Sequence, residues 1–212
     1  MTNNNWTNLH SIYKKQDWIK LPSIFAEQAI TYFPESGKIL ELGSGYGQDS
    51  IYFAKHDYEV TGTDIETDAL RENLLANPSS VKDKIKTVQL DLRQPMAFED
   101  NSFDVVYAHL SLHYFDQSTT ERIFDDIKRI LKSDGILAYF TNSTSDPEYD
   151  TGEKLDEGYY EIEGEPKRYL NVETAGRFAH EFSPLLLDNN GETYKDSVKG
   201  IHNLIRFIGR KI

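Results

Sequence analysis

The sequence predicts an α/β fold in which a doubly wound, mostly parallel sheet carries helices on both faces. The first observation is that short apolar runs alternate with helix-like patterns from residue 37 to residue 141. The second is that the first apolar run leads directly into a glycine-rich turn and a helix start. The third is that the next two runs are followed by carboxylates, Asp64 and Asp91. Carboxyl ends of parallel strands share one sheet edge, where such folds bind ligands.

Composition limits the classes of function. The chain has 212 residues, a net charge of −12 and no cysteine, so we expect one domain without a disulfide, a thiolate nucleophile or a zinc–thiolate site. The acidic balance repels nucleic acid backbones, and no apolar run approaches the ~20 residues of a membrane span. The first ten residues lack the pattern of a signal peptide. We therefore expect a cytoplasmic monomer or homodimer that binds neither nucleic acid nor membrane.

Two helices are expected before the first strand. Apolar residues stand among polar ones from Trp6 to Lys20, and a second helical pattern opens at Pro22 and runs to Phe33. Together, residues 1–36 would form an N-terminal helical cover.

The glycine turn is the most informative stretch. Ile39 to Leu42 predicts a buried strand, and Gly43 to Gly47 follows as a turn before a helix. A dinucleotide fingerprint would need glycine or alanine where Gln48 stands, and a phosphate loop would need a lysine after the glycines. Neither NAD nor ATP is favoured by this pattern.

The next elements continue the alternation. A helix is expected from Gln48 to His56, a strand from Tyr58 to Asp64, a helix from Thr67 to Asn77 and a strand from Lys86 to Leu90. A carboxylate about 20 residues past the glycine turn can accept hydrogen bonds from both ribose hydroxyls. Asp64 therefore supports an adenosine-containing ligand without identifying it.

The pattern Glu41-x-Gly43-x-Gly45-x-Gly47 resembles the first motif of class I S-adenosylmethionine (SAM) dependent methyltransferases. The resemblance implies that Glu41 orients the methionine portion of SAM, that Asp64 binds the ribose, and that Asp91 accepts a hydrogen bond from the adenine amino group. The implied cofactor-binding residues are Glu41, Gly43, Ser44, Gly45, Gly47, Asp64, Ile65, Asp91, Leu92 and His109. No metal is implied.

The stretch after the third strand resembles the fourth motif of the same family. Ser102 to Ala108 predicts a strand, and the resemblance places the following loop beside the transferable methyl group. His113 is the candidate general base, although a histidine packed at a strand exit with no proton role is an alternative. The expected acceptor-lining residues are Tyr13, Trp18, His113 and Tyr114.

The last third departs from simple alternation. A capping box of Ser118 with Glu121 predicts a helix start, Ser133 to Gly135 predicts its end, and Ile136 to Thr141 predicts the fifth strand. The segment 146–168 contributes −6, half of the net charge, and predicts a hairpin that turns at Gly164–Pro166. We expect residues 143–170 to be an acidic hairpin insertion. With the N-terminal segment, it would border the acceptor pocket.

The C-terminal segment predicts a short helix and two strands. Asn171 would cap a helix through Ala179, and strands are expected over Pro184–Asp188 and Ile201–Ile208. In the resembled family, a strand, turn and strand here insert an antiparallel strand. The resemblance therefore implies seven strands in a single domain, residues 1–212.

The expected function is transfer of a methyl group from SAM to a small molecule, neutral or cationic, by in-line displacement. One alternative is a SAM-binding module without catalysis, whose cofactor motif would be degraded. The other is an NAD(P)-dependent oxidoreductase, which would carry the dinucleotide fingerprint and a Tyr-x-x-x-Lys pair. The Asn-Pro-Pro-Tyr pattern of amino-group DNA methyltransferases is absent from the sequence.

Overall fold

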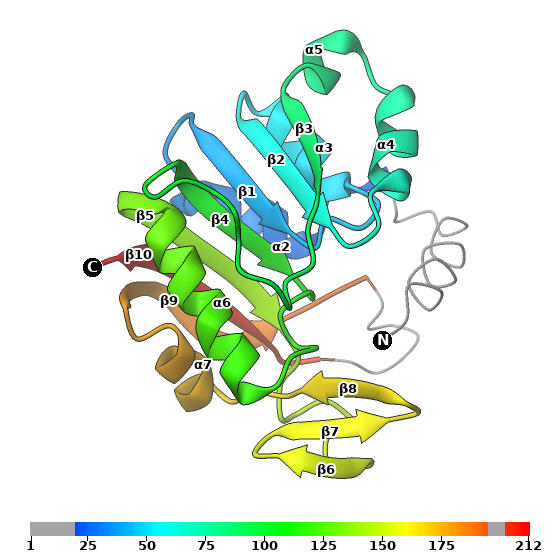
Figure 1. The fold of residues 1–212 in the computed structure, drawn as a ribbon, viewed down its shortest axis with the longest axis vertical. Helices are drawn as coiled ribbons and strands as arrows, with labels where there is room; N and C mark the ends of the chain where they lie inside the picture. The colour runs from blue at the N-terminus through cyan, green and yellow to red at the C-terminus, as the bar shows by residue number, and fades with distance from the viewer. Residues whose placement is uncertain (1–19, 195–201) are drawn as a thin grey trace.

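The computed structural model describes residues 20–194 and 202–212 (Figure 1). Its main sheet has the order β3-β2-β1-β4-β5-β10-β9. The strands are β1 (Lys38–Leu42), β2 (Glu59–Asp64), β3 (Ile85–Gln89), β4 (Phe103–His109), β5 (Leu131–Thr141), β9 (Phe182–Gly191) and β10 (Leu204–Lys211). Neighbours from β3 to β5 pair in parallel, whereas β10 is antiparallel to both β5 and β9. The predicted fold class is confirmed.

Helices cover both faces of this sheet. They are α2 (Ile24–Ala29) with the 3₁₀ turn η2 (Ile30–Tyr32), α3 (Gln48–Lys55), α4 (Asp68–Leu75), α5 (Ser79–Lys82), α6 (Gln117–Ile130) and α7 (Val172–Phe178). Successive residues of β1 point to opposite faces of the sheet and pack in two different hydrophobic clusters. Leu40 and Leu42 pack with α6 and α7, while Ile39 packs with α2 and α3 on the opposite face (Figure 1). Among the described helices, none is long and apolar enough to cross a membrane.

Both expected boundaries of α6 are wrong. The N-cap is Asp116, whose carboxylate accepts from the Thr119 amide at 2.7 Å, so Ser118 already lies in the first turn. The Ser118 hydroxyl donates to the same carboxylate. At the other end Leu131 pairs with Phe103 of β4, and strand pairing therefore ends the helix before the expected stop at Ser133.

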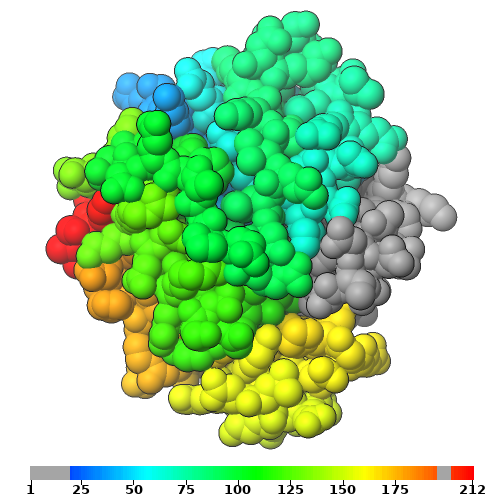
Figure 2. Space-filling view, in the orientation of Figure 1, coloured from blue at the N-terminus to red at the C-terminus, as the bar shows by residue number. Residues whose placement is uncertain are grey.

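The acidic insertion is a three-stranded antiparallel sheet instead of a hairpin. We call residues 153–168 the appendage. It consists of β6 (Glu153–Asp156), β7 (Tyr159–Ile162) and β8 (Glu165–Arg168). Glu163 and Gly164 have φ of 53° and 80°, so the turn lies one residue earlier than expected and Pro166 falls within β8. In the space-filling view the appendage, in yellow, adjoins the green surface near α6 (Figure 2).

The C-terminal helix begins where the sequence predicted it. Asn171 caps α7 in a reciprocal capping box with Thr174, as expected of that asparagine. The short helix α5 forms where only a helix stop was expected, directly after Pro78. Of the helix expected from Trp6 to Lys20, only Lys20 lies within the described residues. Tyr13 and Trp18 lie outside them.

Candidate active site

The glycine turn after β1 has a left-handed backbone that glycine adopts without strain. Gly43, Gly45 and Gly47 have φ of 74°, 53° and 78°. A Cβ on Gly43 would lie 2.3 Å from the Cβ of Ser111, and a Cβ on Gly47 would lie 2.1 Å from a methyl group of Leu70. Packing therefore leaves no space for a Cβ at Gly43, which contacts the chain after β4, or at Gly47, which contacts α4. This holds whether or not a ligand also lies against the turn.

The end of β2 holds this turn in place. The Gly45 amide donates to Asp64 Oδ2 at 2.8 Å, and the Ser44 amide donates to the Thr63 carbonyl at 2.7 Å. The other carboxylate oxygen of Asp64 accepts from the Glu66 amide at 3.1 Å. Backbone amides thus fix the Asp64 carboxylate at the strand end, where the sequence predicted a ribose ligand.

Asp91 and Leu92 follow β3 at the same sheet edge. Arg93 donates to both Asp91 oxygens, at 2.9 Å from Nε and 2.7 Å from Nη2, and these hydrogen bonds hold the pKa of Asp91 below its usual range. The Arg93 amide also donates to Oδ1 at 2.9 Å and Nε also reaches Oδ2 at 3.0 Å, so a further donor to this carboxylate would share an oxygen with Arg93. Leu92 is buried, and at the neighbouring strand end the Ile65 carbonyl accepts from Gln89 at 3.0 Å.

Glu41 is a buried acid in β1. Its carboxylate accepts from the Ser50 hydroxyl on α3. Burial, followed by the negative charge of Asp49, raises the pKa of Glu41 well above its usual value, and Asp64 adds a smaller effect. The raised pKa favours the neutral form of Glu41, so the negative charges near the turn are those of Asp49 and Asp64, and these oppose a pyrophosphate.

Asp49 was not singled out from the sequence. It is 3% exposed and accepts from the Ser23 amide at 2.6 Å, the Ser23 hydroxyl at 2.8 Å and the Tyr107 hydroxyl at 2.8 Å. Burial, then the Asp49 charge, raises the pKa of Tyr107, so the phenol stays protonated and able to donate. This network joins α2, α3 and β4. The only sequence signal was an acid on the apolar face of a short helix.

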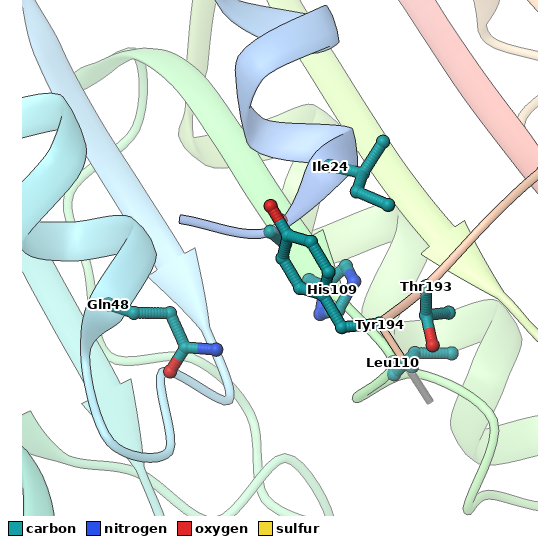
Figure 3. Close-up of a pocket in the computed structure, with 7 residues that line it drawn as sticks. Ile24, Gln48, His109, Leu110, Thr193 and Tyr194 are labelled. Atoms are coloured by element: carbon teal, nitrogen blue, oxygen red, sulfur yellow. The ribbon is translucent and has the colours of Figure 1, made fainter. Parts of the chain in front are cut away.

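A pocket opens beside the start of α3 (Figure 3). It encloses about 310 Å³, part of it open to solvent, and is lined by Ser23, Ile24, Gln48, His109, Leu110, Thr193 and Tyr194. The His109 ring stacks on Phe140 with centroids 5.0 Å apart. Leu110 has a φ of 51°, an uncommon conformation for a branched residue that turns the chain sharply out of β4. The structure thus brings α2, α3, the exit of β4 and the chain after β9 together around His109.

His113 and Tyr114 lie further along the same exit and are not among the residues that line this pocket. His113 is 5% exposed, and its ring centroid lies 4.0 Å from that of Tyr114. The described residues contain no group of three or more histidines and acids that could hold a metal ion.

Residues 40–139 match the family model described as "Methyltransferase domain". The chain is 34% identical over 113 residues to the putative methyltransferase YqeM of Bacillus subtilis, covering 52% of this chain and 44% of YqeM. The matched part spans less than half the length of the first curated relatives.

Solved structures share the fold over most of the chain. A SAM-dependent methyltransferase from Methanosarcina mazei matches with a TM-score of 0.70 and 21% identity, over 86% of this chain and 96% of that one. A Burkholderia thailandensis N1-methyltransferase, solved with 1,6-didemethyltoxoflavin and S-adenosylhomocysteine bound, matches with a TM-score of 0.72 and 14% identity, over 98% and 84%. Residues 40–139 are therefore similar to a methyltransferase domain, and the chain shares the fold of SAM-dependent methyltransferases.

Proposed function

We propose that this protein binds SAM along the carboxyl edge of β1, β2, β3 and β4 and transfers its methyl group to a small molecule. The observation that carries the proposal is the convergence at one sheet edge of a left-handed glycine turn and the acids Glu41, Asp64 and Asp91. Asp64, already oriented by two backbone amides, accepts from the ribose hydroxyls, and Asp91 accepts from the adenine amino group.

The described residues fit SAM better than a phosphate-bearing cofactor. The negative charges of Asp49 and Asp64, which also raise the pKa of Glu41, would oppose a pyrophosphate and favour a sulfonium cation. When bound, SAM supplies an electrophilic methyl group that departs from a neutral thioether. The protein's remaining task is to hold the acceptor and exclude water.

We place the acceptor in the pocket around His109. Ser23, Gln48 and Thr193 offer polar atoms there, and Ile24 and Leu110 offer apolar surface. Holding two reacting groups at near-attack distance can contribute ~7–11 kcal/mol, which needs neither a metal nor a covalent intermediate. A small acceptor is supported by the Burkholderia relative, and the buried acids favour a neutral or cationic one.

If the acceptor must lose a proton, the base in this proposal is either His113, which the sequence predicted, or His109, which lines the pocket. His113 is buried beside Tyr114 and would have to reach the acceptor from outside this lining. Replacing each histidine separately distinguishes the two.

Binding and turnover test the proposal separately. SAM and S-adenosylhomocysteine should each raise the melting temperature, whereas NAD and ATP should not. A shift with NAD alone would refute the cofactor assignment and support an oxidoreductase. If SAM binds, a panel of amines, thiols and hydroxylated compounds is screened for S-adenosylhomocysteine release. SAM binding without release for any member would favour a non-catalytic SAM-binding module.

A further inference from the structure

The segment after β4 is held by the appendage. We call residues 111–116, between β4 and α6, the exit loop. Three consecutive carbonyls of this loop accept hydrogen bonds from two appendage residues. The His113 carbonyl accepts from the Arg168 amide at 2.6 Å, the Tyr114 carbonyl from the Tyr159 hydroxyl at 3.2 Å, and the Phe115 carbonyl from Arg168 Nε at 3.2 Å.

Arg168 is buried to an unusual degree for a cation, with 3% of its surface exposed. Its guanidinium lies over the ring of Tyr159, 4.8 Å from the centroid, and 5.7 Å from the ring of Phe178. Nη1 donates to the Glu157 carbonyl at 3.2 Å, whereas Nη2 is buried without a hydrogen-bond partner among the described residues. A side chain enclosed in this way has little conformational freedom, so it can hold the loop carbonyls that accept its hydrogen bonds in one position.

The charges around the guanidinium come from both sides of the junction. Asp156 belongs to the appendage, and Asp116 and Glu121 belong to the start of α6; all three carboxylates act on Arg168. The desolvation of the guanidinium outweighs these charges and lowers the pKa of Arg168 from its usual value. A buried cation that is only partly compensated is typical of a site that specifies geometry more than it adds stability.

We propose that Arg168 and Tyr159 are positioning residues through which the appendage sets the conformation of the exit loop. The functional part of this inference rests on the proposed methyl transfer, because the loop follows directly on the pocket residues His109 and Leu110. Arg168 and Tyr159 contact this loop and Phe178 of α7, whereas Gly45 and Asp64 contact each other at the end of β2. Perturbing the appendage should therefore affect the acceptor and leave cofactor affinity unchanged.

Hydrogen exchange on the full chain tests the contact without any activity. Tyr159→Phe removes the hydroxyl that donates to Tyr114 and keeps the ring beneath the guanidinium. The Arg168 amide, which donates across the junction to His113, should then exchange about fivefold faster, the effect of one lost hydrogen bond. The next amide, of Tyr169, donates to Gly158 within the appendage and not across the junction, at 2.7 Å, and serves as the internal reference.

A matched control is Tyr139→Phe. It also removes a tyrosine hydroxyl that donates to a carbonyl, that of Ala175 at 2.8 Å, but outside the junction. It should leave the Arg168 amide unchanged relative to Tyr169. Equal acceleration in both variants, or none in Tyr159→Phe, would overturn the positioning role.

Kinetics test the functional consequence. In Tyr159→Phe and Arg168→Lys the acceptor KM should rise or kcat fall by about fivefold, while the dissociation constant of S-adenosylhomocysteine stays within about twofold of wild type. A matching loss of cofactor affinity would contradict the inference. Failure of the wild-type protein to bind S-adenosylhomocysteine would instead refute the proposed function, and the exchange experiment would still decide the structural part.

Discussion

The amide of Gly45 donates to Asp64 Oδ2 at 2.8 Å, so the turn after β1 and the end of β2 form one rigid unit. The carboxylate therefore orients the glycine turn as well as standing where a ribose would lie. Substitutions at Asp64 should therefore change both the conformation of the glycine turn and the affinity for the cofactor.

Asp64→Ala should weaken binding of S-adenosylhomocysteine by about 10-fold to 150-fold, corresponding to ~1.5–3 kcal/mol for lost hydrogen bonds to a charged acceptor. Asp64→Asn keeps one oxygen as an acceptor and should lose less affinity than Asp64→Ala. Isothermal titration calorimetry measures both. Unchanged affinity in Asp64→Ala would mean that the ribose binds elsewhere.

Gly43→Ala should destabilise the protein more than a positive φ alone would. The new Cβ meets the Ser111 Cβ at 2.3 Å, and the φ of 74° adds ~1 kcal/mol of strain. Gly164→Ala is the matched control, because its φ is 80° and nothing lies within 4 Å of the new Cβ. Thermal unfolding should show a clearly larger loss for Gly43→Ala.

A second substitution then separates clash from strain. Ser111→Gly in the Gly43→Ala background removes the clashing Cβ, although it also removes the Ser111 hydroxyl that donates to Leu42 at 2.6 Å. Partial recovery of the melting temperature is expected. If the double variant is no more stable than Gly43→Ala, the clash does not explain the loss.

Glu41→Gln should change the pH dependence of stability in a defined direction. Because the pKa of Glu41 is raised in the folded protein, wild type loses stability as pH rises from about 4.5 through that raised value. A glutamine does not ionise, so the free energy of unfolding of the variant should rise relative to that of wild type as pH increases over this window. Urea unfolding without ligand, from pH 4.5 to 8, measures the difference.

Asp188→Asn supplies the control of opposite sign. Arg206 lowers the pKa of Asp188, whose contribution to stability is present above the usual carboxyl range and is lost as pH falls. This variant should be less stable than wild type at neutral pH, with the difference shrinking in acid. A Glu41→Gln difference that follows the same trend as Asp188→Asn would contradict the assignment.

His113→Asn should lower turnover by roughly 10²-fold without changing cofactor affinity if His113 is the general base. The loss should be largest for acceptors of high pKa and small for those already ionised at neutral pH. His109→Asn is compared in the same assay, because His109 lines the pocket. Profiles of rate against pH that match wild type in His113→Asn would return His113 to a packing role.

The sequence by itself determined the parallel strands, the glycine turn and the acids at the strand ends, because each depends on a local pattern of residues. Alternation of apolar residues predicts strands, and left-handed φ values at Gly43, Gly45 and Gly47 follow from a property of glycine alone. Asp64 and Asp91 could be placed at one edge since parallel strands end together.

Only the tertiary structure decided which side chains meet across long separations. Asp49 contacts Ser23, 26 residues away, and Tyr107, 58 residues away, and Arg168 contacts Phe115 from a distance of 53 residues. No period or motif encodes such pairs, because they depend on how helices and the appendage dock on the sheet. For the same reason, the sequence did not predict that His109 lines the pocket beside α3 or that His113 is enclosed beside Tyr114.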